Sequence, residues 1–158
     1  MPTVPQNNLK NVVGTERKLP YPILDDGTAD INGGDLVYWD AANHVVKALD
    51  SDANAEFIAG VAEDTSFTNL YGTKKYKSQL NCYVGAICAF YATVGETYAH
   101  LDAVGFGGDA QTIGLIAGGV TKKIGYILLR PGAVPAAAVA GDKVEVLVIA
   151  QVPVAPMF

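Results

Sequence analysis

Residues 34–62 read GDLVYWDAANHVVKALDSDANAEFIAGVA, and this stretch decides the fold class. A Gly-Asp pair opens a short apolar run, a polar turn follows, and a second apolar run contains another glycine. Residues 95–128 repeat that order from a Gly-Glu pair, and residues 141–149 begin it a third time as GDKVEVLVI. Glycine accepts a positive φ and aspartate bonds nearby backbone, so a Gly-acid step is a simple entry into a strand. The pattern predicts two similar β-units packed into one core, with turns rather than ligand loops between strands.

Short apolar or alternating runs, separated by Gly, Asn and Asp, predict an all-β protein: an antiparallel β-sandwich or a small β-barrel. Alternation is clearest near the C-terminus, where Val144, Val146 and Val148 share one face. Seventeen glycines disfavour long helices, and only residues 51–57 are expected to form a helical turn. The predicted strands are 35–39, 44–49, 56–63, 80–92, 96–101, 110–117, 123–130 and 142–152.

The two ends differ in composition from this single β domain, which is predicted to span residues 25–152. Residues 1–24 contain four of the eight prolines and show no sustained periodicity, which predicts an extended N-terminal arm. Residues 153–158, PVAPMF, form an apolar C-terminal tail. Both ends are expected to dock on a neighbouring molecule.

The charge content indicates a subunit of a larger assembly. Half of the 158 residues are apolar but only 17% are charged, whereas soluble domains carry roughly 25% charged residues. Burial against other subunits would cover the uncharged surface that this composition leaves. A net charge of −5 offers no broad attraction to nucleic acid or to an anionic membrane. The sequence shows neither a secretion signal nor the run of ~18 apolar residues that a membrane helix needs.

Two glycine-rich or acidic stretches suggest ligand loops but fit turns better. GFGGDAQTIG at 105–114 lacks the following helix and lysine of a phosphate loop, and Asp109 would repel an anion. TADING at 28–33 does not match a calcium loop, because Thr28 and Trp39 stand where carboxylates belong. Turn chemistry explains this second stretch, and a weakly held ion stays an alternative at the acids Asp25, Asp26, Asp30 and Asp35.

No catalytic constellation emerges from the remaining reactive residues. His44 and His100 lack neighbours at ligand spacing, and no Ser or Cys lies in a nucleophile context. On one straight strand Cys82 and Cys88 would lie about 20 Å apart, which is too far for a disulfide. We therefore expect two reduced thiols, no cofactor and no enzymatic activity.

YGTKKYK at 71–77 interleaves two tyrosines with three lysines. This pattern suits stacking on nucleic-acid bases, but the acidic remainder of the chain makes an acidic protein neighbour the better partner. We expect a solvated loop or a hairpin tip.

The order GDLVYWDAANHVVKA, FIAGVAEDTS, YVGAICAFYATVGE and GDKVEVLVIA resembles the small all-β decoration, or cement, proteins of tailed-bacteriophage heads. The resemblance covers about residues 30–152. It implies a non-enzymatic virion protein that binds the outer surface of an icosahedral capsid, as a homotrimer or alternatively a homodimer. Its partner would be the major capsid protein, whose subunit contacts it would stabilise. Because binding contacts vary in this family, the resemblance assigns no site residue.

The partner-binding residues predicted from the chain itself lie in the arm, the basic loop and the tail. An arm can add a strand to an exposed sheet edge, and many copies on a lattice strengthen retention. The alternative is a head or tail binding module, such as a fibre base or host-surface binder, using residues 71–77 and Trp39. The predicted contact residues are Pro2, Val4, Pro5, Leu9, Lys74, Lys75, Lys77, Met157 and Phe158.

Overall fold

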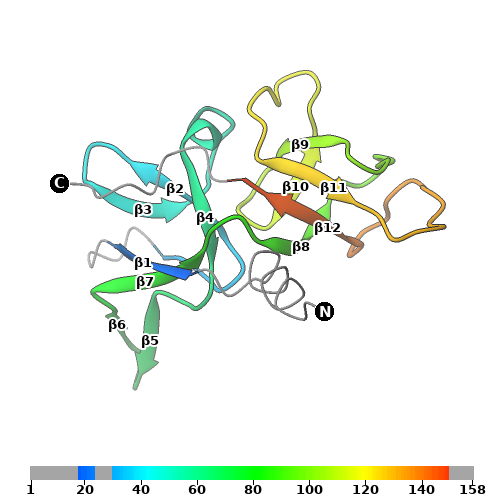
Figure 1. Ribbon diagram of the computed structural model, residues 1–158. Coiled ribbons are helices and arrows are strands. Elements are labelled where there is room, and N and C mark those ends of the chain that lie inside the picture. The colour runs from blue at the N-terminus through cyan, green and yellow to red at the C-terminus, as the bar shows by residue number, and fades with distance from the viewer. Residues whose placement is uncertain (1–17, 24–29, 150–158) are drawn as a thin grey trace, which may run out of the picture.

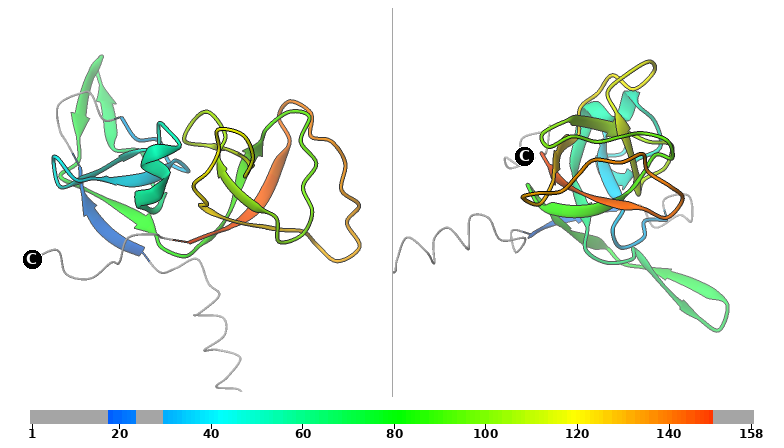
Figure 2. Two further views of the ribbon diagram at one scale, coloured as in Figure 1. Left: turned by 90° about the horizontal axis from the view of Figure 1, so that it is seen from above. Right: turned by 90° about the vertical axis from the view of Figure 1, so that its right-hand side faces the viewer.

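A computed structural model describes residues 18–23 and 30–149, and in these ranges the protein is all-β, as predicted. The chain forms two β lobes that lie side by side (Figures 1 and 2). The expected helical turn is a short 3₁₀ helix, η1 (Ala53–Phe57). The strands are β1 (Lys18–Pro22), β2 (Leu36–Asp40), β3 (Val45–Ala48), β4 (Ile58–Ala62), β5 (Phe67–Leu70), β6 (Thr73–Tyr76), β7 (Gln79–Tyr83), β8 (Ile87–Ala92), β9 (Ala103–Phe106), β10 (Thr112–Leu115), β11 (Gly125–Leu128) and β12 (Lys143–Val148).

The first lobe is a five-stranded antiparallel sheet in the order β1-β7-β4-β2-β3. Its central strand, β4, has the sequence IAGVA, and all five of its residues are buried. An unbroken apolar run of this length is what a strand covered on both faces requires.

The second lobe is a small closed barrel in the order β10-β8-β12-β11-β9. Its strand pairs are antiparallel except for β8 with β10, which run parallel. The alternation predicted for the last strand is confirmed in its described part, because Val146 and Val148 are fully buried while Lys143 and Glu145 are exposed. Closure leaves the barrel without an open sheet edge.

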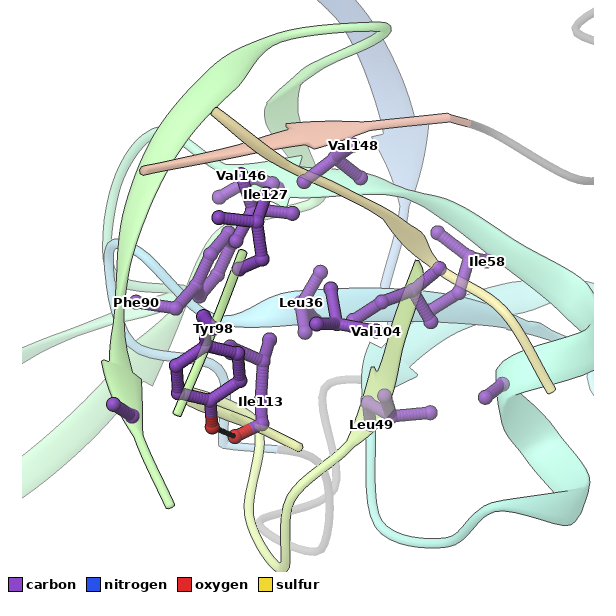
Figure 3. Close-up of a cluster of buried hydrophobic side chains, with 14 of the residues drawn as sticks. Leu36, Leu49, Ile58, Phe90, Tyr98, Val104, Ile113, Ile127, Val146 and Val148 are labelled. Carbon is purple, nitrogen blue, oxygen red and sulfur yellow. Dashed lines mark hydrogen bonds between the residues drawn. The ribbon is translucent and has the colours of Figure 1, made fainter. Parts of the chain in front are cut away.

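One hydrophobic cluster joins the two lobes (Figure 3). Leu36 and Ile58 enter it from the sheet, and Phe90, Ile113 and Val146 enter it from the barrel. Both β-units therefore contribute to this cluster, although they are not alike: one is an open sheet and the other a closed barrel. A second cluster on the other face of the sheet holds Tyr21, Ile23, Ile31, Val37, Val46, Ala59, Ala62, Leu80 and Cys82.

The three Gly-acid steps are tight turns, which confirms their predicted role. Gly34, Gly95 and Gly141 have φ angles of +92°, +88° and +90°. In the third turn, the Asp142 N–H donates to the Val139 carbonyl at 3.1 Å, and the Val139 N–H donates to the Asp142 carboxylate at 3.0 Å. The acid thus closes the turn that the glycine makes possible.

Two predicted strands are wrong in an informative way. The run 80–92 is two strands, β7 and β8, separated by a bend at Gly85, where φ is +66°. The sequence of 80–92 is one apolar run because β7 contributes to the core of the first lobe and β8 contributes to the core of the second. The segment 96–101 is not a strand, because a second turn at 99–102 redirects it: the Ala99 N–H donates to the Asp102 carboxylate at 2.7 Å.

The segment Lys18–Ile23, assigned from sequence to the arm, belongs to the first lobe. β1 pairs with β7 from Lys18↔Tyr83 to Pro22↔Gln79. Tyr21 and Ile23 are buried in the second cluster. Prolines are compatible with this position because β1 is an edge strand.

Candidate functional site: an exposed hairpin and the end of the barrel

The most exposed element of the described chain is the hairpin formed by β5 and β6. It projects from the first lobe as a two-stranded ribbon (Figure 2). Its base is fixed by Ser66, whose carbonyl accepts the Lys77 N–H at 2.9 Å and whose hydroxyl accepts the Ile31 N–H at 3.0 Å. The prediction that residues 71–77 lie in a loop or at a hairpin tip is confirmed.

The hairpin ends in a two-residue loop, Tyr71-Gly72, closed by the pair Leu70↔Thr73. The φ angles are +51° at Tyr71 and +82° at Gly72, the signs of a type I′ turn. That turn favours Asn, Asp or Gly at its first position, and a bulky residue there is strained. Tyr71 is nevertheless fully exposed, and Leu70 beside it is 55% exposed. The apex therefore holds two apolar side chains in solvent at a conformational cost.

The three lysines predicted as contact residues share this hairpin but differ in their partners. Lys74 forms an ion pair with Asp30, which also accepts a hydrogen bond from the Tyr76 hydroxyl at 2.5 Å. Lys77 approaches Asp64 at 3.9 Å, and both side chains are exposed. No ion pair of Lys75 is present in the described ranges. Lys74 thus anchors the hairpin, while Lys75 stays available to a neighbouring molecule.

Asp30, one of the four acids considered as ligands of an ion, therefore binds two side chains of the hairpin, Lys74 and Tyr76. The bonds from Lys74 and Tyr76 hold the pKa of its carboxyl below the ordinary value. Asp35 instead accepts hydrogen bonds from the Asn32 N–H and the Gln111 amide, each at 2.8 Å. Asp25 and Asp26 lie outside the described residues. Across 18–23 and 30–149, no three His, Cys, Asp or Glu side chains gather closely enough to hold a metal ion.

The terminal contact residues predicted from sequence, in the ranges 1–17 and 150–158, also lie outside the described residues. They are Pro2, Val4, Pro5, Leu9, Met157 and Phe158. Trp39, named in the alternative prediction, packs against Tyr21 with ring centroids 4.8 Å apart and is only partly exposed. It supports the second core cluster rather than an exposed rim.

A second candidate surface, here called the barrel end, comprises the loops 93–102 and 129–142. Hydrogen bonds join the two loops: Gly95 N–H to the Ala138 carbonyl and Ala138 N–H to the Glu96 carbonyl, both 2.8 Å. The Leu129 N–H also donates to His100 Nδ1 at 3.0 Å. The longer loop is the orange segment at the right of Figure 1. Within it, residues 131–141 contain two prolines and no charged residue, a composition that indicates an exposed apolar loop.

The barrel end is apolar and grooved. Val94, Leu101, Val134 and Val139 are all more than half exposed. A groove of about 390 Å³ is lined by His100, Leu129, Arg130, Pro131, Gly132, Ala133 and Pro135. Leu101, like Tyr71, has a positive φ, +69°. An exposed apolar residue is thus held by left-handed backbone on each of the two surfaces.

The glycine-rich stretch 105–114 forms the turn between β9 and β10. The Gln111 N–H donates to the Asp109 carboxylate at 2.8 Å, and a strand rather than a helix follows. The expectation that this stretch is not a phosphate loop is therefore supported by its geometry.

The two cysteines lie on different strands, Cys82 on β7 and Cys88 on β8, and both are free thiols. Burial raises the pKa of the Cys82 thiol to about 12, and it also raises that of Cys88. Thiols with raised pKa values hold little of the reactive thiolate at neutral pH. Their geometry is that of small core residues.

Comparison of the chain with protein-family models, curated proteins and solved structures finds no match in any of the three. Within the described ranges, no helix has the length and hydropathy needed to cross a membrane.

Proposed function

We propose that this protein is a structural virion protein that binds the outside of an icosahedral phage capsid. In this role it is a decoration protein without enzymatic activity, and it stabilises contacts between major capsid protein subunits. Its location is the outer surface of the virion, and its form there is a homotrimer, or alternatively a homodimer.

The observation that carries this proposal is the pair of exposed apolar surfaces, one at the hairpin apex and one at the barrel end. Tyr71 and Leu70 lie at the hairpin apex, and Leu101 and Val134 lie at the barrel end. Exposed apolar patches of this kind mark protein contacts more often than they mark catalytic sites. The all-β fold and the resemblance over residues 30–152 support a decoration protein in particular.

The test uses emptied heads of the phage whose genome encodes this chain, mixed with the purified full-length protein. Co-sedimentation at a saturating, stoichiometric occupancy is expected. A variant lacking residues 2–17 tests the predicted arm, and the deletion stops there because Lys18 begins β1. Loss of attachment with an unchanged melting temperature supports the arm, and wild-type occupancy contradicts it.

The alternative, a host-surface binding module, is favoured by the exposed tyrosine and Lys75 on the hairpin. It predicts retention on host cells or their surface polysaccharide but not on heads. Retention on cells alone would replace the decoration proposal.

A further inference from the structure

A polar cavity of about 360 Å³ lies where the two lobes meet, apart from the two apolar surfaces described above. The first lobe contributes the turn that leads into β2, and the barrel contributes β8 and the turn between β9 and β10. The volume falls within the roughly 300–1,000 Å³ that is typical of small-ligand sites. The lining residues are Asn32, Asp35, Tyr91, Asp109, Ala110 and Gln111.

Gln111 holds the walls of this cavity together. Its side-chain amide donates to the Asp35 carboxylate at 2.8 Å, and its backbone N–H donates to the Asp109 carboxylate at 2.8 Å. Its carbonyl accepts the Tyr91 N–H at 2.9 Å. Groups from three parts of the chain are thus fixed around one residue before any ligand arrives, and such preorganisation favours binding.

The hydrogen-bonding capacity that remains in the cavity is mainly that of acceptors. Asp35 is only 5% exposed, and each of its carboxylate oxygens accepts one bond from a neutral N–H, which leaves one lone pair on each oxygen. The second carboxylate oxygen of Asp109, Gln111 Oε1 and the side-chain amide of Asn32 have no partner among the described residues. A ligand that donates several hydrogen bonds therefore fits this cavity.

The lining also excludes other classes of ligand. It contains no Lys, Arg or His, so a phosphate or a free carboxylate would meet two carboxylates and no cation. An apolar ligand would remove water from the buried Asp35 carboxylate without replacing its hydrogen bonds. No three His, Cys, Asp or Glu side chains that could hold a metal gather in the described ranges, this cavity included. Two classes remain: a neutral ligand rich in hydroxyls and an organic cation.

The two carboxylates do not require a cation, although neither forms an ion pair within 18–23 and 30–149. Asp35 is held instead by two neutral donors, the Asn32 N–H and the Gln111 amide, and such bonds stabilise a carboxylate without a counter-ion. Asp109 is exposed, where an ion pair contributes little. Hydroxyl donors are therefore the better match for the remaining acceptors.

Tyr91 adds an aromatic ring to these acceptors. It is 39% exposed, and the Lys143 ammonium lies over its ring, 4.6 Å from the centroid. An aromatic ring packs on the C–H groups of a pyranose, while neighbouring polar groups accept bonds from the hydroxyls. We propose that this cavity binds a neutral sugar residue, with Tyr91 packing on the sugar ring and the carboxylates of Asp35 and Asp109 accepting hydrogen bonds from its hydroxyls.

The test is a titration of the isotope-labelled full-length protein with neutral sugars, followed by NMR. The probes are glucose, galactose, mannose, rhamnose and N-acetylglucosamine, each at millimolar concentration. For at least one of them, saturable shifts of the Asn32 and Gln111 amides are expected. Ethylammonium chloride, titrated in the same way, is the probe for an organic cation.

Two variants test the role of the lining. Tyr91→Ala and Asn32→Ala should each weaken binding of that sugar roughly five- to tenfold. The melting temperature should change little, because both side chains are exposed. Tyr126→Ala is the matched control: the Lys123 ammonium lies 4.7 Å from the Tyr126 ring centroid, but Tyr126 does not line the cavity. This control should bind the sugar as tightly as wild type does.

Several results would overturn the inference. These are the absence of shifts with every sugar of the panel, shifts confined to residues outside the cavity, or wild-type affinity in both Tyr91→Ala and Asn32→Ala. Shifts of the cavity amides with ethylammonium but with no sugar would overturn it as well, since they would assign the cavity to a cation.

This inference goes beyond the decoration role and does not rest on it, because sugar binding is measured on the free protein. Failure of the wild-type protein to attach to emptied heads would refute decoration and leave the sugar site standing. Failure to bind any sugar of the panel would refute the sugar site and leave the decoration role standing.

Discussion

Asp40, at the end of β2, shows how single residues fix the turns of this protein. Its carboxylate accepts hydrogen bonds from the Asn43 amide at 2.7 Å and the Ala42 N–H at 3.1 Å, and it pairs with Lys47 at 2.8 Å. The bond from Asn43, followed by that from Lys47, lowers the pKa of Asp40 to about 2. A carboxyl whose pKa falls on folding stabilises the native state above its unfolded pKa and loses that effect as the pH drops.

We therefore predict that the Asp40 carboxyl carbon titrates by NMR with a midpoint near 2 rather than at its ordinary 3.8. The stabilisation should be complete above pH 4 and disappear between about pH 4 and 2. In Asp40→Asn the free energy of unfolding should fall less steeply over that window than in wild type. A midpoint at the ordinary value would show that the turn does not hold the carboxylate.

At the residue scale, the sequence predicted the turns, because their geometry depends on residues that are neighbours along the chain. The Gly-acid turns could be predicted because glycine accepts a positive φ and an aspartate side chain bonds nearby backbone, two properties that favour turns. The partner of Asp30 was not readable, because Lys74 is 44 residues away along the chain. Trp39 was equally ambiguous, since it packs against Tyr21 of β1, a strand that the sequence did not predict.

At the scale of elements, the hairpin depends on its anchor at Asp30. The ribbon has few buried contacts of its own, because every β5 and β6 residue except Phe67 and Tyr76 is exposed. Asp30→Ala removes the acceptor of both Lys74 and Tyr76 and is expected to free the hairpin from the body. Amide exchange of Thr73–Tyr76 should then accelerate at least tenfold, while the melting temperature changes little.

Asp64→Ala is the control, because its pairing with Lys77 at 3.9 Å is exposed and contributes little. Equal exchange rates in wild type and Asp30→Ala would mean that the β-ladder alone holds the hairpin.

The predicted elements succeeded where a strand was bounded by turn residues and failed where tertiary packing decided. β2, β3, β4, β10, β11 and β12 all lie within or close to their predicted ranges. β1 was missed because its prolines disfavour a strand. Proline is tolerated in an edge strand, but the sequence does not show that β1 lies at an edge. β5 and β6 were missed because an exposed ribbon lacks the apolar alternation that marks a half-buried strand.

At the scale of the whole molecule, the shared core predicts that the two lobes unfold as one cooperative unit. Ile58 of the sheet is fully buried in the cluster that also contains Val104 and Val148 of the barrel (Figure 3). Ile58→Ala should cost about 2–5 kcal/mol. Hydrogen exchange should show β7 amides of the sheet and β11 amides of the barrel losing protection together. Retained protection in β11 alone would indicate that the barrel is stable independently.

Neither the closed barrel nor its contact with the sheet was predictable in detail. The sequence supports a sandwich and a barrel equally, because both bury one face of short alternating strands. The parallel pair β8–β10 depends on closure of the ring, which no local pattern encodes. The two exposed surfaces follow from that global arrangement.

The most direct test of the decoration role is an image of emptied phage heads incubated with the full-length protein, reconstructed by electron cryomicroscopy. The decoration role predicts added density at regular positions on the outer capsid surface, into which the two-lobed β body fits. Bare heads at saturating protein concentration would contradict it.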